Sequence, residues 1–123
     1  MDTNFERRAR LRVVAGPDVT VRFKAGDLGF EEVRITNLSV GGCFATLPRP
    51  GAMAFRQGTR LEQFRFNNPD LEGLPFDAEV AYVLGGAAGG RGGMARVGLG
   101  IHFLAMAPSM AEALRVYVEA RLG

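Results

Sequence analysis

Six short segments, several with apolar residues at every second position, constrain the fold more than any other feature of this chain. That two-residue period is typical of β-strands with one buried face. The clearest case is the segment 76–84, which directly follows a proline. The six segments span residues 18–24, 32–38, 43–47, 60–66, 76–84 and 96–104. Residues that favour turns separate them, so we expect six short antiparallel strands.

The last part of the chain changes to a helical period. From 108 to 122, apolar residues recur at spacings of three and four, which predicts an amphipathic helix. Ser109 and Glu112 have the spacing of a capping box at its start. The helix could close one end of a barrel, pack on its wall or form a dimer interface.

These patterns predict a mainly β fold, a small six-stranded antiparallel β-barrel with a C-terminal α-helix. The chain has 123 residues, 47% of them hydrophobic, which is enough for one buried core. We expect a single domain over 1–123, with a flexible arginine-rich arm at 1–15, the barrel at 18–105 and the helix at 108–122. No apolar run resembles a signal peptide or a membrane span, so we expect a soluble, cytoplasmic protein.

An arginine cluster lies near the start of the chain. Four of the six residues from 7 to 12 are arginine, although the whole chain carries 15 Lys+Arg against 13 Asp+Glu. A guanidinium group keeps its charge, bonds phosphate oxygens in pairs and stacks on flat rings. The cluster therefore either binds a multivalent anion or forms a solvated, frayed arm.

A polar turn follows the second predicted strand. Asn37 and Ser39 share a face in an extended chain, and by parity it is the face that should be buried. Two polar groups in a core would need partners. Either a β-bulge re-aims them or they lie at the barrel rim, within reach of a ligand. Gly41 and Gly42 favour a bulge or a close backbone approach. A turn that only closes a hairpin is the remaining alternative.

Catalytic chemistry has no clear place in this sequence. His102 is the only histidine, so it makes neither a metal cluster nor a catalytic triad. Cys43 is better explained as a small core residue than as a nucleophile, and Asp77 and Glu79 as a solvated strand face. The glycine-rich stretch 85–93 lacks the lysine of a phosphate-binding loop and precedes a predicted strand, which favours a hairpin loop. We predict no enzyme activity, no catalytic residue, no metal and no cofactor.

Binding is the function that remains. The arginine cluster and the 37–42 turn together could hold phosphates and read a guanine, whose O6 and N7 atoms accept hydrogen bonds from arginine. A barrel that binds single-stranded nucleic acid is an alternative of another class. It would need exposed aromatic residues among basic ones, whereas the strand aromatics here mostly fall on the apolar parity. We therefore expect no nucleic-acid partner.

Two motifs in this order resemble the PilZ domain family. Arg8-x-x-x-Arg12 resembles the family's RxxxR pattern, and Asn37-x-Ser39-x-x-Gly42 resembles its [D/N]xSxxG pattern. The later stretches that also resemble the family are 58–61, 100–103 and the closing helix. The resemblance covers nearly the whole chain.

The resemblance implies a split barrel that binds the bacterial second messenger cyclic di-GMP on its surface. It further implies a stand-alone receptor and adaptor, monomeric or weakly dimeric, that passes the signal to an unidentified effector protein. Motility and biofilm formation are among the outputs it suggests. The alternative is a ligand-free interaction module of the same fold, for example in type IV pilus assembly.

The resemblance also implies the ligand-binding residues. They are Arg7, Arg8, Arg12, Asn37, Ser39, Gly41 and Gly42. The two motif arginines would grip phosphates and guanine faces, the polar pair would bond a guanine edge, and the glycines would allow close approach. Arg7, just before the motif, implies a stacked pair of ligand molecules. Asn37 stands where aspartate is more frequent in the family, so we expect weaker binding.

Overall fold

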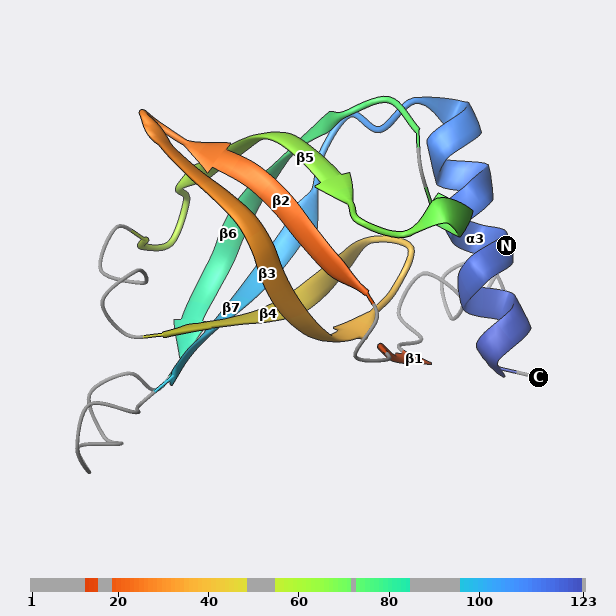
Figure 1. Ribbon diagram of the computed structural model, residues 1–123, viewed down its shortest axis with the longest axis horizontal. Coiled ribbons are helices and arrows are strands. Elements are labelled where there is room, and N and C mark those ends of the chain that lie inside the picture. The colour runs from red at the N-terminus through yellow and green to blue at the C-terminus, as the bar shows by residue number, and fades with distance from the viewer. Residues whose placement is uncertain (1–12, 16–18, 49–54, 72, 85–95, 123) are drawn as a thin grey trace, which may run out of the picture.

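A computed structural model describes residues 13–15, 19–48, 55–71, 73–84 and 96–122 (Figure 1). The elements in chain order are β1 (Val13–Val14), β2 (Thr20–Ala25), β3 (Leu28–Leu38), β4 (Gly42–Pro48), β5 (Arg60–Phe66), the 3₁₀-helix η1 (Pro69–Leu71), β6 (Phe76–Leu84), β7 (Arg96–Phe103) and α3 (Pro108–Leu122). Within these ranges, no helix has the length and apolar character needed to cross a membrane.

Six strands form a closed antiparallel barrel. They follow the order β3-β2-β5-β6-β7-β4, and β4 pairs again with β3, so the sheet has no open end. The short β1 pairs with the end of β3, on the edge that β2 has left. The predicted fold class, a six-stranded barrel followed by one helix, is confirmed.

The barrel interior is filled by aromatic and branched side chains. Phe64 is fully buried, and its ring centroid lies 5.3 Å from that of Phe76 and 5.5 Å from that of Phe103. Phe23 stacks on it from the neighbouring strand at 5.6 Å. Aromatic pairs at these separations add about 0.5–1.5 kcal/mol beyond the effect of burial alone. This cluster joins strands that are far apart in the sequence.

The first hairpin is tighter than the sequence predicts. Residues 25–30 read as a turn, but Ala25 pairs with Leu28 and only Gly26 and Asp27 lie between the strands. Gly26 has a φ of 62°, a conformation that costs glycine little. A two-residue connection suits the twist of a hairpin, so β3 begins earlier and Phe30 joins the packed aromatic residues.

A register shift also changes which face of the sheet the last residues of β6 occupy. The sequence places Tyr82 and Leu84 on the buried face, but the pairing with β7 shifts between Val80 and Tyr82. After the shift, Tyr82 pairs with Gly100, and its ring fills the space in which a side chain at Gly100 would lie. Tyr82 is therefore on the outer surface, 38% exposed.

Val13 and Val14 lie in a strand, although the sequence places them in the flexible arm at 1–15. Val13 is buried and pairs with Leu38, and the Ala15 amide donates to the Thr36 carbonyl at 3.1 Å. An apolar side chain that reaches the core gains about 25 cal/mol per Å² of buried area, which favours order over fraying. The rest of the predicted arm, residues 1–12, lies outside the described residues.

The helix α3 has the bounds that the sequence predicts. Its buried face carries Met110, Leu114, Tyr117 and Val118, which pack toward η1 and β1 at one end of the barrel (Figure 1). The helix thus closes a barrel end, one of the three placements left open by the sequence.

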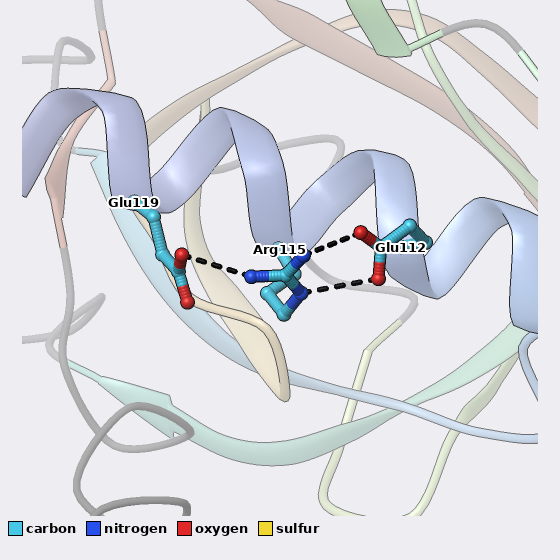
Figure 2. A network of polar contacts seen from close by, with 3 residues as sticks. All are labelled: Glu112, Arg115 and Glu119. Atoms are coloured by element: carbon cyan, nitrogen blue, oxygen red, sulfur yellow. Dashed lines mark hydrogen bonds and ion pairs between the residues drawn. The ribbon is translucent and has the colours of Figure 1, made fainter.

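The start of α3 differs from the predicted capping box. The Ala111 amide donates to the Ala107 carbonyl at 2.9 Å, so the first turn begins at Pro108 rather than after Ser109. Proline is well suited to that first position because it has no amide hydrogen to satisfy. Glu112 bonds Arg115 instead of capping the helix (Figure 2).

Arg115 joins two carboxylates on the surface of α3. Its Nε donates to Glu112 Oε1 at 3.1 Å, a second nitrogen donates to Glu112 Oε2, and a third donates to Glu119 Oε1 at 2.9 Å (Figure 2). The hydrogen bond from Arg115 lowers the pKa of Glu112, and the two carboxylates raise the pKa of Arg115.

We expect an NMR titration of the Glu112 carboxyl carbon to give a midpoint below the ordinary value for glutamate. A lowered folded-state pKa means that the ion pair stabilises the helix above the ordinary pKa and that this contribution is lost as the pH falls through the lowered one. In Arg115→Gln, the midpoint should rise toward the ordinary value. An unchanged midpoint in that variant would show that Arg115 is not the cause.

Candidate ligand-binding site

The turn between β3 and β4 is held by Ser39. Its amide donates to the Gly42 carbonyl at 2.8 Å, its hydroxyl oxygen lies 3.1 Å from the same carbonyl, and it accepts from the Gly42 amide at 3.2 Å. Ser39 is only 2% exposed. A buried hydroxyl with both kinds of partner is satisfied, so the turn is rigid without a ligand.

A β-bulge places Asn37 at the surface. The β3–β4 register shifts between Ile35 and Asn37, so that Thr36 is the extra residue. Leu38 then takes the core position that simple parity would assign to Asn37, and Asn37 is half-buried. The bulge that the sequence allowed is present and re-aims Asn37, whereas Ser39 stays buried and bonds Gly42 within the turn.

Gly42 is packed against the backbone of β7. It pairs with His102, and a side-chain carbon at this position would overlap the carbonyl oxygen of Ile101. The neighbouring Gly41 carbonyl accepts from the Phe103 amide at 2.9 Å. The close approach expected at these glycines therefore exists, and in this structure the approaching group is another strand of the barrel.

The described part of the predicted site forms one compact group. Asn37 lies between Val14 of β1 and Phe44 of β4, and the Ser39–Gly42 contacts follow directly. Asn37, Ser39, Gly41 and Gly42 are thus brought together. Arg7, Arg8 and Arg12 lie outside the described residues.

The residues that the sequence analysis considered for catalysis are not brought together by the fold. Cys43 points into the core and has no exposed area. His102, which pairs with the neighbouring residue Gly42, is exposed on the outer face. Asp77 pairs with Arg60 at 3.2 Å on the surface, as a solvated strand face would. Across the described ranges, no group of three or more potential metal-binding side chains occurs.

The sequence did not reveal two further features near or beyond the turn. His102 pairs with Gly42 on one side and Glu79 on the other, which only the closed sheet makes visible. Arg22 and Arg65 face each other across β2 and β5 and line two clefts to which the 37–42 turn does not contribute. Alternation predicts that Arg22 points outward but says nothing of its partner.

Comparison with known families identifies this architecture. The family model described as the PilZ domain matches residues 6–120, which is most of the chain. The chain belongs to the PilZ domain family. A search of curated proteins found no significant match.

Solved structures with the same fold support that assignment. The chain is similar to the PilZ domain of Escherichia coli YcgR, solved with c-di-GMP, at 22% identity and a TM-score of 0.69, covering 94% of this chain and 92% of that one. It is also similar to K. pneumonia MrkH, at 13% identity and a TM-score of 0.74, covering 93% of this chain and 48% of that one. It is likewise similar to the Bacillus subtilis inhibitor of motility MotI/DgrA, at 18% identity and a TM-score of 0.68, covering 90% of this chain and 49% of that one. The chain spans about half the length of the last two proteins.

Replacing Gly42 by alanine should destabilise the barrel, because its new methyl group would overlap a backbone atom that cannot move aside. We expect a loss of about 1–3 kcal/mol in the free energy of unfolding, as for other overpacked sites. Urea denaturation measures this loss. Gly29→Ala is the matched control, since a side chain there meets nothing within 4 Å. Equal stabilities for the two variants would contradict the close approach.

Proposed function

We propose that this protein binds cyclic di-GMP between its N-terminal arginine motif and the 37–42 turn. The observation that carries the proposal is the pairing of β1 with β3. Val13 pairs with Leu38 and Val14 with Asn37, both within the turn, and Arg12 is bonded directly to Val13. The short strand therefore ties the arginine stretch to the turn that carries the second motif. Membership of the PilZ family, and the likeness to a PilZ domain solved with c-di-GMP, support the same ligand.

The arginines supply charge and planar contact. In this proposal, Arg8 and Arg12 bond the phosphates and stack on the guanine faces, as a guanidinium group can do both. Arg7 adds a third cation, which would allow a second, stacked ligand molecule. Charge-assisted hydrogen bonds contribute about 1.5–3 kcal/mol each, so a few of them, less the cost of ordering the arm, give micromolar affinity.

The turn supplies a preformed surface. Ser39 holds its shape through Gly42, so the ligand does not have to order it. In this proposal Asn37 bonds a guanine edge from its half-buried position beside β1. Ser39 acts by holding the turn, because its hydroxyl is buried and already bonded to Gly42 as donor and acceptor.

The signal would pass to another protein. We propose a cytoplasmic, non-enzymatic receptor and adaptor whose exposed surface changes when the arginine arm closes over the ligand. An effector protein that recognises the closed form would then be controlled by the ligand concentration.

Calorimetric titration of cyclic di-GMP into the purified protein tests the ligand and the arginines. We expect micromolar or tighter binding that Arg8→Ala and Arg12→Ala each abolish, because each removes phosphate and guanine contacts together. Arg56→Ala, which removes an exposed arginine before β5, should leave the affinity unchanged. A stoichiometry of two that falls to one in Arg7→Ala would support the role given to Arg7. No heat and no thermal shift at several hundred micromolar ligand would refute the proposal and favour the ligand-free interaction module.

Asn37→Asp should tighten binding. An aspartate carboxylate accepts hydrogen bonds from guanine N–H groups more strongly than an amide, and about 1.4 kcal/mol of added interaction corresponds to tenfold. Calorimetry under the same conditions measures the change. Gln57→Glu makes the same change of charge in an exposed turn and should have no effect. Weaker binding by Asn37→Asp would indicate that the amide N–H₂ of Asn37, rather than its oxygen, contacts the ligand.

A further inference from the structure

Two arginines oppose each other on the outer wall of the barrel, apart from the ligand-binding turn. Arg22 of β2 and Arg65 of β5 are direct register partners, and both are half-buried. Like charges placed opposite each other on neighbouring strands destabilise a sheet. An anion bound between the two guanidinium groups would relieve this repulsion.

Neither guanidinium is neutralised within the described part of the chain. The ion pairs there involve other arginines, Arg60 and Arg115, and no side-chain hydrogen bond joins the guanidinium group of Arg22 or Arg65 to another described residue. The Nε of Arg65 is buried and has no acceptor among these residues. A buried donor without a partner costs about 1–3 kcal/mol.

The pair stands between two clefts. The end cleft, about 710 Å³, is lined by both arginines, by Asn67 and Asn68, and by apolar residues that include Leu74 and Met110. The side cleft, about 450 Å³, is lined by both arginines together with Lys24, Glu31, Gln63 and Pro75. Arg22 and Arg65 line both clefts, so the two clefts adjoin at this pair on β2 and β5, and together they are treated as one track.

The chemistry of the track indicates its occupant. None of the described residues that line the end cleft is acidic, and Leu74 beside it is 66% exposed. Arginine next to an exposed apolar residue is the composition of a protein interface. An extended polyanion is less suitable, because Glu31 lines the side cleft and Glu62 opposes Lys24.

We propose that this track, called here the Arg22–Arg65 track, binds an extended segment of a partner protein that carries a carboxylate beside an apolar residue. The carboxylate bonds the two guanidinium groups, and the apolar residue packs against Leu74 and Met110. The site is separate from the 37–42 turn, so its occupation does not depend on the ligand proposed above. It would hold a partner protein whether or not the ligand is bound, in addition to the ligand-dependent contact proposed above.

Panning a phage-displayed library of random peptides against the full chain tests this proposal. We expect the selected peptides to share an aspartate or glutamate next to an apolar residue. The consensus peptide, made with a fluorescein label, is then titrated by fluorescence anisotropy. Arg22→Gln and Arg65→Gln should each weaken binding about tenfold, because each removes a charge-assisted contact.

Matched controls separate the site from general charge. Arg34→Gln and Arg56→Gln remove exposed arginines that line neither cleft and should change the affinity by less than about twofold. Thermal melts and cyclic di-GMP titrations of all four variants check folding and the other site independently. Loss of ligand binding with intact peptide binding would count against the proposed function alone.

Three results would overturn the proposal that the Arg22–Arg65 track binds a partner segment. The first is a consensus without acidic residues. The second is equal affinity of the consensus peptide for Arg22→Gln, Arg65→Gln and the wild type. The third is a library that selects no acidic peptide, together with binding of a nucleoside triphosphate that needs both arginines. The last would reassign the track to a phosphate ligand.

Discussion

The pairing of β3 with β4 is the interaction on which the rest of this structure depends. It closes six strands into a barrel, and the bulge at Thr36 within it rotates the end of β3. Leu38 therefore enters the core, while Asn37 remains half-buried at the surface. Closure leaves the barrel without an unpaired edge, and the same contact shapes the turn that carries the family's second motif.

Several features that suggest ligand contact prove to serve the scaffold as well. Ser39 is bonded within its own turn, and Gly42 allows β7 to approach. On the outer wall, Gly98 lies under the ring of Phe44 and Gly100 under that of Tyr82. A motif of this kind is constrained twice, since the residues that would receive a ligand also hold the turn in the shape that the ligand requires.

Charge is distributed unevenly over this barrel. The arginine cluster of the sequence adjoins β1, whereas Arg22 and Arg65 share a strand pair on the wall. Among the described surface arginines, Arg60 and Arg115 have carboxylate partners, and Arg96 donates to Thr46. Arg22 and Arg65 differ from ordinary solvated charge because they are half-buried and directly opposed, and the buried Nε of Arg65 has no acceptor among the described residues.

The sequence by itself determined the strand order along the chain, the bounds of β5, β6 and α3, and the two motifs that identify the family. Alternation and helical spacing are local properties, so they can be read without the fold. Tertiary structure alone decided the bulges that turn Leu38 inward and Tyr82 outward, the strand formed by Val13 and Val14, and the meeting of Arg22 with Arg65. Each depends on which strand lies alongside, because register is set by pairing across the sheet and by burial of one face, and neither is recorded in the neighbouring residues of the chain.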